Sequence, residues 1–503
     1  ALAPCRQTAQ TVETQATLMN TTPDAVVVGS GPNGLAAAIT LAQSGCSVLM
    51  LEACDSVGGG MRSAELTLPG FTHDVCSAIH PLARASPFLR SLPLAAYGLE
   101  WINPPAALAH PLFDSSAALL LPSIESTSRL LGNDARSYCK IMNRLVHSWD
   151  QIIDDVLGPL RFPRFPLASF RFGWSALQAA SGFACRRFQT EPARALFAGI
   201  AAHSVLPLAK PFSAAFGLIL GAAGHTAGWS LCRNGSQHLA YALAAHFTAC
   251  GGTVETGVTV KSLKDIPASR IILFDLSPQQ VAAIVGSTFP SSYRQRLLAH
   301  RHGPGVFKID WALDSPIPWK SNDCLQAGTV HVGGTLSDIA SSEAAVWQGN
   351  HPDHPFVILS QPSLFDSSRA PQGKHTAWAY CHVPNGSTMD MTDRIETQIE
   401  RFAPGFRQRI LARSAMNSAD LEQYNRNYHG GDIAGGINSV WQRVVRPLGQ
   451  WKPYATPLPG IYICSSSTPP GGGVHGMCGY YAACAALREE GSKNTAGNKN
   501  VWS

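Results

Sequence analysis

The residues best placed to do chemistry lie between Asp24 and Glu52. A run of valines leads into Gly-Ser-Gly-Pro-Asn-Gly, an alanine-rich stretch follows, and Ser-Val-Leu-Met-Leu then ends in Glu52. Gly29 permits a tight turn, Gly31 lets the backbone approach a pyrophosphate, and Gly34 lets the following helix pack close to the strand. The helix N-terminus attracts phosphate, and an acid at the end of the second strand accepts hydrogen bonds from ribose. This pattern predicts a strand–helix–strand unit that binds a dinucleotide.

A second glycine cluster indicates which dinucleotide binds. Glu52 is followed within ten residues by Gly59, Gly60 and Arg62. Paired glycines at this place let another backbone segment pass close to the diphosphate, which is typical of FAD proteins and unusual in plain NAD dehydrogenases. Arg62 is a candidate contact for phosphate or flavin, and a solvated arginine is the alternative.

The C-terminal region holds a third glycine-rich turn. Residues 460–464 read as a strand, residues 465–473 as a turn, and 480–487 as a helix. Main-chain N–H groups in such a turn can approach an isoalloxazine edge, and the helix N-terminus stabilises negative charge on the reduced ring. The glycines that leave room for the ring are Gly471, Gly472, Gly473 and Gly476.

Histidines supply the candidate proton carriers, because a neutral imidazole is suited to proton transfer near pH 7. His475 ranks first, since it lies inside the glycine-rich turn. His80 follows, because its segment is expected to pass the flavin, and His73 and Asp74 are further polar candidates. A structural hydrogen bond is the alternative for each histidine.

Composition narrows the function classes. The chain has 503 residues, with 45% hydrophobic and only 14% charged, and its net charge of +5 is dispersed. We therefore expect two or three lobes and no nucleic-acid partner. The thirteen cysteines are scattered without a Cys-x-x-Cys pair, so we expect neither a disulfide framework nor a metal site, and a reducing, cytoplasmic location. No apolar run reaches the roughly 18 residues that span a bilayer.

The segment 160–188 interleaves arginine with phenylalanine. Aromatic residues with snorkelling cations suit a membrane surface or the mouth of an apolar tunnel. A surface loop that packs its phenylalanines on the core is the favoured interpretation, and peripheral membrane contact is the alternative.

Three separated segments are predicted to build one nucleotide-binding domain in an α/β fold. They are 23–95, 228–290 and 446–490, with an α+β substrate-binding domain inserted as 96–227 and 291–445. Within these segments we expect a hairpin near 253–260, helices over most of 96–227, strands at 305–313 and 375–382, and helices at 390–402 and about 406–414. Polar residues 1–22 are predicted to be a disordered tail, and 491–503 a C-terminal tail.

The chain resembles the phytoene-desaturase-like branch of the flavin amine oxidase superfamily, and within it bacterial relatives of pyridine nucleotide-disulfide oxidoreductase domain-containing protein 2. The matching stretches cover nearly the whole folded chain: Val28–Glu52, Leu66–Leu82, Ala198–Leu208, Gly228–Leu239, Gly303–Leu313, Gly373–Thr388, Phe402–Leu411, Gly430–Gly436 and Trp441–Ala483. One departure is Asn234, which stands where relatives often have glycine.

The resemblance implies a noncovalent FAD in a Rossmann-like domain assembled from three segments, with a substrate domain over its reactive face. Gly29, Gly31, Gly34 and Glu52 would hold the ADP half, and Gly59, Gly60 and Arg62 would follow the diphosphate. The backbone of Val258 would lie near the adenine. The residues expected beside the flavin are Gly473, Val474, Gly476 and Met477.

The expected function is an FAD-dependent dehydrogenase or desaturase that acts on an apolar, polyene-like small molecule by hydride transfer to flavin N5. The alternatives are a non-redox flavin-dependent isomerase and an FAD-stabilised interaction protein with little turnover. A second nucleotide fingerprint is absent from the sequence. We therefore expect electrons to leave the flavin for oxygen or a quinone.

Overall fold

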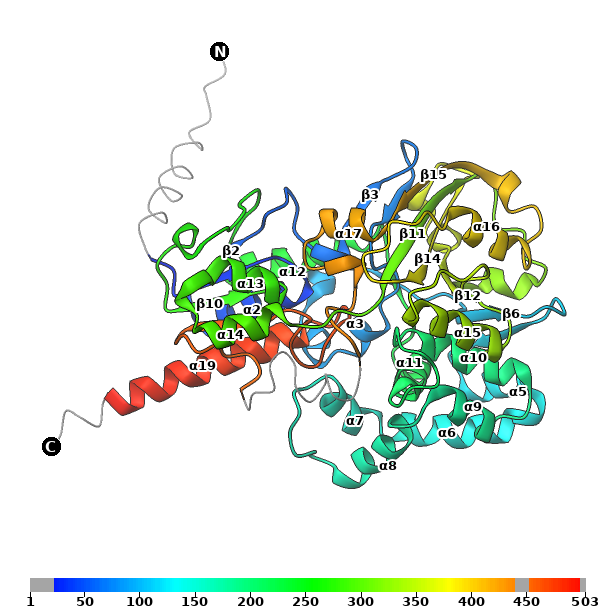
Figure 1. The fold of residues 1–503 in the computed structure, drawn as a ribbon, viewed down its shortest axis with the longest axis horizontal. Coiled ribbons are helices and arrows are strands. Elements are labelled where there is room, and N and C mark those ends of the chain that lie inside the picture. Colours follow the sequence, from blue (N-terminus) through cyan, green and yellow to red (C-terminus); the bar gives the residue numbers. More distant parts are fainter. Residues whose placement is uncertain (1–21, 439–451, 498–503) are drawn as a thin grey trace, which may run out of the picture.

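The computed structural model describes residues 22–438 and 452–497, which form two lobes side by side (Figure 1). One lobe surrounds a five-stranded sheet and the other a seven-stranded sheet. The predicted disordered tail falls outside the described residues, apart from Thr22. No helix in the described ranges is long and apolar enough to cross a membrane.

The five-stranded sheet is parallel throughout. Its order is β16 (Ile461–Ile463), β10 (Ile271–Phe274), β1 (Ala25–Val28), β2 (Val48–Leu51) and β9 (Thr253–Glu255). The strands come from parts of the chain far apart in sequence. Central β1 is buried along its whole length, as expected where helices cover both faces of a parallel sheet. This sheet confirms the predicted α/β fold class.

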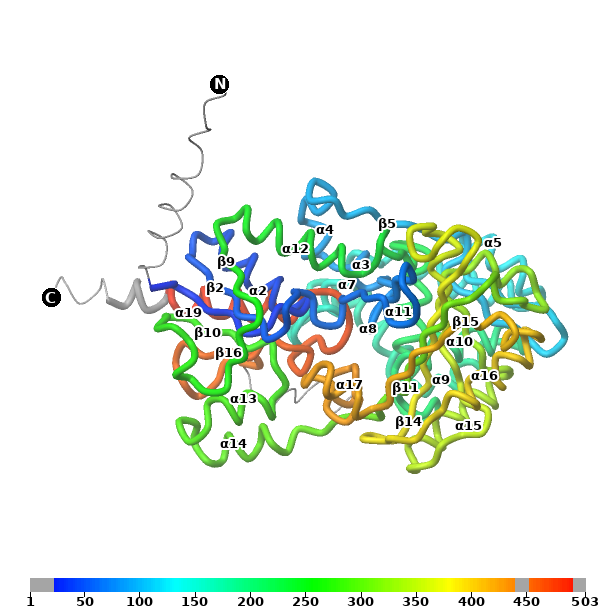
Figure 2. The backbone as a smooth tube through the Cα atoms, turned by 90° about the horizontal axis from the view of Figure 1, so that it is seen from above, coloured from blue at the N-terminus to red at the C-terminus, as the bar shows by residue number. Residues whose placement is uncertain are grey.

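Alternate residues of β1 face two separate cores. Val27 packs with residues of α2 (Pro32–Gln43), α12 (Gln237–Ala249) and α19 (Met477–Gly497). Val26 and Val28 pack instead with α13 (Pro278–Val285) and α14 (Ser291–Leu298). Figure 2 shows the helices of the second group along the lower side of this lobe, with α2 and α12 above them.

The seven-stranded sheet is mixed. Its order is β15 (Ile410–Met416), β11 (Gly305–Leu313), β14 (His375–Val383), β13 (Val357–Ser360), β12 (Ala327–Val332), β6 (Ala106–Pro111) and β7 (Ala117–Leu120), and only β12 and β6 run parallel. α10 (Glu191–Ala202) and α15 (Leu336–Trp347) cover one face, while α16 (Thr392–Glu400) covers the other through Ile395 and Ile399.

Smaller elements complete the chain. Two small antiparallel pairs are β3 (Ser63–Glu65) with β4 (Thr72–Asp74), and β5 (Trp101–Ile102) with β8 (Leu231–Cys232). The remaining α-helices are α3 (Pro81–Ala85), α4 (Pro87–Arg90), α5 (Ile124–Leu130), α6 (Ala135–His147), α7 (Trp149–Val156), α8 (Pro166–Ala176), α9 (Ala180–Arg187), α11 (Ser213–Thr226) and α17 (Ser418–Tyr424).

Three local predictions were wrong. The expected hairpin near 253–260 is a single strand, because β9 pairs with β2 and the chain then turns at Gly257 with φ +73°. The expected helix at 406–414 is largely the edge strand β15, whose side chains alternate between exposed and half-buried as the period of a strand requires. The region 96–227 is not only helical, since β6 and β7 join the seven-stranded sheet.

Candidate active site

A cavity of about 550 Å³ lies between the two lobes. Its wall includes Val28, Leu51 and Asp275, which stand at the carboxyl ends of β1, β2 and β10. Ligands of open parallel sheets bind at this edge of the sheet. From there the cavity extends to β13 and β14 of the other sheet, through Ile358, Leu359, Trp378 and Tyr380.

The first glycine turn forms the cavity wall beside α2. Gly29 has φ +99°, and it lines the cavity together with Gly31. A Cβ on Gly31 would lie 2.6 Å from Oδ2 of Asp275, and one on Gly34 would overlap the carbonyl oxygen of Gly29. α2 begins without a side-chain cap or an acid in its first turn. The turn thus adds no side chain of its own at the helix N-terminus, where Asp275 lies, while Gly34 serves the close packing predicted for it.

Glu52 lies on the cavity wall and is only 6% exposed. Its Oε2 accepts a hydrogen bond from the amide of Ser30 at 2.9 Å, and its Oε1 accepts one from the amide of Cys54 at 2.9 Å. The hydroxyl of Ser30 also donates to Oε2. These bonds hold the carboxylate beside the glycine turn, at the position expected for a ribose acceptor.

The second glycine cluster crosses the first. A Cβ on Gly59 would lie 2.9 Å from the Cα of Gly31, so this passage requires glycine. Gly59, Gly60 and Arg62 all line the cavity. The guanidinium of Arg62 lies 3.4 Å from Glu52 and stacks over the ring of Tyr424 at 5.3 Å. Its buried Nε has no hydrogen-bond partner among the described residues, which leaves a donor for an anionic ligand.

Asp275 is a site residue that sequence reasoning missed. It follows β10 directly, and its Oδ2 accepts a hydrogen bond from the amide of Gly34 at 2.9 Å. Burial raises the pKa of this carboxyl to about 8. The signal was present in the sequence, because an acid at the carboxyl end of a buried parallel strand points toward the ligand edge of the sheet.

The C-terminal turn divides the residues predicted beside the flavin. Gly473 and Val474 line the cavity. Gly476 and Met477 lie behind them: a Cβ on Gly476 would lie 2.9 Å from the Cβ of Ala36 in α2, and Met477 is buried at the start of α19. Gly476 and Met477 are therefore packing residues behind the cavity wall, and their place beside the flavin stays a prediction.

Both ring nitrogens of His475 form hydrogen bonds with the backbone of its own turn. Its Nδ1 accepts a hydrogen bond from the amide of Met477 at 3.0 Å, and its Nε2 lies 3.1 Å from the carbonyl oxygen of Gly471. The ring is therefore the neutral tautomer with the proton on Nε2, and it is 1% exposed. It does not line the large cavity. Both ring nitrogens therefore hold the turn together, and the role of His475 in proton transfer stays a prediction.

His80 keeps one nitrogen available. It lines the cavity, and its Nε2 lies 2.9 Å from the hydroxyl oxygen of Ser236. That hydroxyl donates to the carbonyl oxygen of Ser77, so Nε2 of His80 must be the protonated donor. Nδ1 has no partner within the described part of the chain. Burial lowers the pKa of His80 to about 4, so the ring is neutral near pH 7 with an acceptor at Nδ1.

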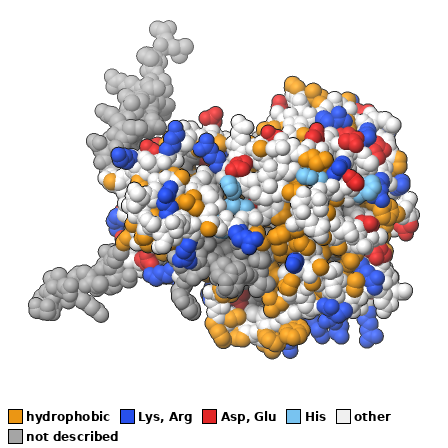
Figure 3. Space-filling view, viewed as in Figure 1, with side chains coloured by type: hydrophobic (Ala, Val, Ile, Leu, Met, Phe, Trp, Pro, Cys, Tyr) orange, Lys and Arg blue, Asp and Glu red, His pale blue; other side chains and the backbone are white. Residues whose placement is uncertain are grey.

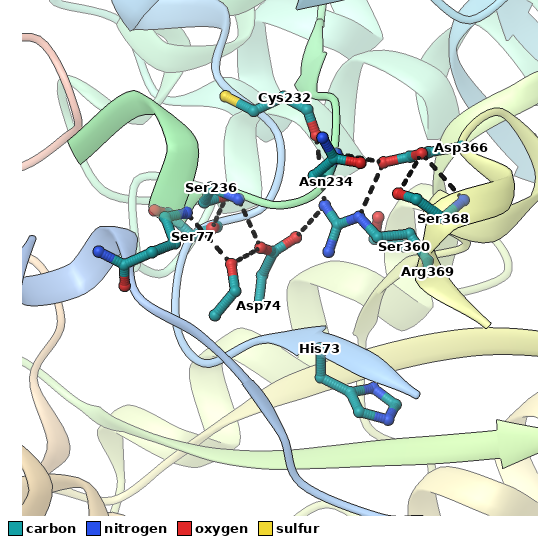
Figure 4. Close-up of polar contacts among 12 residues, drawn as sticks. His73, Asp74, Ser77, Cys232, Asn234, Ser236, Ser360, Asp366, Ser368 and Arg369 are labelled. Carbon is teal, nitrogen blue, oxygen red and sulfur yellow. Dashed lines mark hydrogen bonds and ion pairs between the residues drawn. The ribbon is translucent and has the colours of Figure 1, made fainter. Parts of the chain in front are cut away.

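His73 and Asp74 belong to buried polar networks. Asp74 accepts from the guanidinium of Arg369 at 2.9 Å, and Arg369 also contacts Asp366 at 3.1 Å (Figure 4). Burial alone would raise the pKa of Asp74, but the charge and hydrogen bond of Arg369 outweigh it and lower that pKa. His73 lies 2.8 Å from the hydroxyl of Thr67. Neither side chain lines the cavity.

The same network explains the departure at Asn234. Its φ is +62°, a left-handed conformation that asparagine tolerates better than most residues. Its amide donates to Oδ2 of Asp366 at 2.7 Å. The turn that relatives often build with glycine is therefore intact here, and it is tied to the seven-stranded lobe (Figure 4).

The far end of the cavity, which we call the aromatic end, is formed by Trp229, Ile358, Leu359, Trp378 and Tyr380. Trp378 and Tyr380 stack with ring centroids 5.8 Å apart. His203 also lines this end, and its Nε2 lies 2.9 Å from Nε2 of buried His331. Burial lowers the pKa of His203 to about 3. The aromatic pair was not predicted from the sequence.

The charged side chains on the described cavity wall are all at the opposite, nucleotide end: Glu52, Arg62, Asp275 and Arg426. Arg426 belongs there because the neighbouring Tyr424 lies under Arg62 and Asn427 donates to the backbone of Asp275. The two ends of the cavity therefore differ in chemistry.

A smaller cavity of about 220 Å³ adjoins the large one and shares Leu82, Phe216, Leu220 and Gly472 with it. Its other walls come from α7, α8 and α11, mainly through Ile152, Val156, Phe172 and Ile219. His475 lies on this wall. The second cavity is predominantly apolar.

The nucleotide end fits FAD. The glycines add no side chains of their own at the N-terminus of α2, where the carboxylate of Asp275 accepts from the amide of Gly34, and the unpartnered Nε of Arg62 supplies a donor for a diphosphate. Glu52 offers a buried carboxylate, and Val258 lines the same wall with its amide bonded to the carbonyl of Glu52 at 2.8 Å. The walls toward the flavin side of the site include Gly472, Gly473 and Val474.

Comparisons with known proteins agree with this geometry. Residues 27–92 match the model of the NAD(P)-binding Rossmann-like domain. The chain is 26% identical to mouse pyridine nucleotide-disulfide oxidoreductase domain-containing protein 2, over 93% of both chains. It is 30% identical over 24% of its length to 4,4'-diapolycopen-4-al dehydrogenase from Metabacillus indicus, and 56% identical over 8% to hydroxyneurosporene desaturase from Cereibacter sphaeroides. These segments cover 26% and 8% of those relatives.

Solved structures share the fold. An oxidoreductase from Methanosarcina mazei superposes with a TM-score of 0.62 at 14% identity, over 92% of this chain and 99% of that one. A putrescine oxidase variant superposes with a TM-score of 0.59 at 17% identity, over 93% and 99%. Fold, site and relatives define the chain as an FAD-dependent oxidoreductase. Within that class its sequence is similar to pyridine nucleotide-disulfide oxidoreductase domain-containing protein 2 and, over a short segment, to hydroxyneurosporene desaturase, and its fold is similar to that of putrescine oxidase.

Proposed function

We propose that the chain oxidises an apolar small molecule, such as a polyene, by removing a hydride and a proton from adjacent carbons. The observation that carries this proposal is the uncharged aromatic end of the cavity. Its wall offers Trp229, Ile358, Leu359, Trp378 and Tyr380, whereas the charged wall residues lie at the nucleotide end. Such a wall favours an apolar ligand, because binding removes apolar surface of both the wall and the ligand from contact with water.

Bound FAD supplies the hydride acceptor at flavin N5, and oxygen or a quinone is the proposed final electron acceptor. The chain supplies placement. Trp378 and Tyr380 form a flat stacked wall against which a planar conjugated molecule can lie. His80 presents Nδ1 as a hydrogen-bond or proton acceptor, because Nε2 already donates to Ser236.

Desaturation is supported further by the names of two relatives, a desaturase and a polyene-type aldehyde dehydrogenase. Oxidation of an amine is less well supported. The described wall of the aromatic end carries no acidic side chain to pair with an ammonium group. Tyr480 and Tyr481, which could have formed an aromatic cage, are not on that wall, and Tyr480 packs against Phe88 instead.

Anaerobic reduction of the purified flavoprotein tests the proposal. A carotenoid or a terpene alkene in detergent should bleach the flavin absorbance, whereas putrescine and cyclohexylamine should leave it unchanged. Rapid bleaching by the amines and none by the alkenes would contradict the proposal. Conversion of the alkene to a rearranged product without net bleaching would identify the isomerase alternative.

Two histidine variants separate the roles inside the site. His80→Gln should lower the rate of flavin reduction about tenfold to a thousandfold while FAD stays bound. His475→Gln should instead weaken FAD retention and thermal stability, because its ring bridges two backbone groups of the turn. An unchanged reduction rate in His80→Gln would remove His80 from the chemistry.

A further inference from the structure

Helix α8 exposes an apolar face to solvent. Phe162 just before the helix is 84% exposed, and Phe170 and Trp174 on the helix are 68% and 71% exposed. Leu167, Phe170, Trp174 and Leu177 are spaced three or four residues apart and therefore share one side of the helix. Ala168, Phe172 and Ala176 on the other side pack against the protein core or are buried. α8 is thus apolar on both sides, and only one side has a partner within the described residues.

The apolar face stands out on the surface. Figure 3 shows hydrophobic side chains gathered along the lower edge of the molecule, where Figure 1 places α8. The members of this patch are Leu160, Phe162, Phe165, Leu167, Phe170, Trp174 and Leu177. Half of the exposed large hydrophobic side chains of the described residues therefore come from one short segment, which marks an interaction surface.

The patch is strongly cationic at its margins. Residues 160–188 contain five arginines, no lysine and no acid, so this segment alone carries +5, equal to the formal net charge of the whole chain. Arg161 and Arg164 have acidic partners in Asp155 and Asp154 at 3.5 and 3.8 Å. Arg186 and Arg187 are exposed at the end of α9. The surface is therefore complementary to an anionic partner.

The inner side of α8 covers the smaller cavity. Ser169 and Phe172 line that cavity, with Ile152 and Val156 of α7 and Phe216 and Ile219 of α11 opposite them. The cavity adjoins the large one at Leu82, Phe216 and Leu220. An apolar space thus extends from beneath the exposed face of α8 to the flavin loop at Gly472.

We infer that the exposed face of α8 seats in the headgroup region of an anionic lipid bilayer. A short helix with aromatic and leucine side chains on one face, flanked by arginines, suits this position. A second copy of the chain fits less well, because two such faces would bring together Arg171, Arg186 and Arg187 of each copy, for which the described residues form no salt bridge to an acid. On the proposed function, an apolar substrate would then pass from the bilayer through the smaller cavity to the large one.

Vesicle binding by the full-length FAD-loaded protein tests the inference. We expect co-sedimentation with vesicles of equal parts phosphatidylcholine and phosphatidylglycerol, and much weaker binding to phosphatidylcholine alone. The double variant Phe170→Ser/Trp174→Ser should lose roughly tenfold or more in vesicle affinity. Arg164→Gln/Arg171→Gln should lose roughly tenfold on the anionic vesicles only.

The matched control is Leu411→Ser/Tyr241→Ser, which removes side chains that are 47% and 50% exposed on other surfaces. It should bind vesicles like the unmodified protein. Equal binding by the Phe170→Ser/Trp174→Ser variant would overturn the inference. The inference would also be overturned if the unmodified protein bound no vesicles, formed a dimer in analytical ultracentrifugation, and became monomeric in this variant. Flavin reduction by a detergent-solubilised substrate is measured separately, so failure of docking and failure of the proposed function are distinguishable.

Discussion

The nucleotide end of the large cavity is built mainly from backbone, whereas its aromatic end is built from side chains. At the nucleotide end, glycines at 29, 31 and 59 bring main-chain atoms to the wall. A Cβ at any of these positions would collide with a neighbouring segment of the same chain. At the aromatic end, strands β13 and β14 present Ile358, Trp378 and Tyr380.

This difference teaches where the chain can vary. A wall of glycine and main-chain atoms accepts one shape of ligand, because any added side chain fills the space. A wall of side chains on a rigid sheet can change its ligand by substitution without altering the fold. On the proposed function, the first kind of wall fixes the cofactor and the second selects the substrate.

The sharpest way to break the nucleotide end is Gly34→Val. A Cβ at this position overlaps the carbonyl oxygen of Gly29, so α2 must move away from β1 and the glycine turn must open. We expect protein without flavin absorbance and with little soluble yield. Gly173→Ala is the control, because a Cβ there meets nothing within 4 Å. Normal FAD content in Gly34→Val would show that close packing of α2 is dispensable.

Arg369→Met tests the connection between the two regions. Asp74 and Asp366 would each lose a buried cationic partner, which costs about 3–5 kcal/mol of unfolding free energy. The pKa of Asp74 is lowered in the folded protein. The ionised carboxylate of Asp74 therefore contributes its full share to stability above the ordinary aspartate pKa. This contribution is lost as pH falls through the lower pKa of the folded protein. Urea titrations at neutral and acidic pH should show a large difference between variant and parent that shrinks in acid.

A reciprocal pair of variants separates the two ends. Trp378→Leu should raise KM for an apolar substrate about tenfold and leave FAD affinity unchanged, since less apolar wall remains to cover the ligand. Glu52→Gln should weaken FAD roughly tenfold or more and leave KM of the loaded enzyme unchanged, because a charged acceptor is lost. Flavin fluorescence titration and steady-state kinetics measure the two effects. If either variant moved both quantities equally, the two ends would not be independent.

Asp275→Asn should have almost no effect in acid, because the carboxyl that it replaces is protonated there. The carboxyl of Asp275 has a pKa raised to about 8, so the folded protein keeps a proton that the unfolded chain has released. Stability of the apoprotein should therefore fall as pH rises from about 4 to about 8, by up to about 1.4 kcal/mol per pH unit. Asparagine retains an oxygen for the amide of Gly34 and removes this dependence. If the free energy of unfolding changed with pH in the same way in variant and parent, the carboxyl of Asp275 would be ionised throughout.

Local signals predicted the nucleotide end well. The turn at Gly29, helix α2 and strand β2 with Glu52 at its tip form one continuous stretch, so their order along the chain is also their arrangement in space. Strands β11 and β14 were also predicted, because each is a long run of β-forming residues.

The aromatic end could not be predicted in the same way. Trp378 and Tyr380 become a wall only because β14 pairs with β13 and faces a helix layer from another part of the chain. The edge strand β15 was mistaken for a helix, since its neighbour β11 lies a hundred residues earlier. The sequence shows that a histidine stands at position 475 inside a glycine-rich turn. It does not show the two backbone groups that bind the ring nitrogens.

Strand β16 has a consequence for how the protein is made in a cell. It is the outer neighbour of β10, and α19 directly after it packs along α2 at the other extreme of the chain. During translation the first turn emerges long before residues 461–463 do. The complete flavin pocket therefore cannot form until the ribosome has synthesised residues 461–463 and the helix after them, and until then β10 lacks its outer neighbour in the parallel sheet.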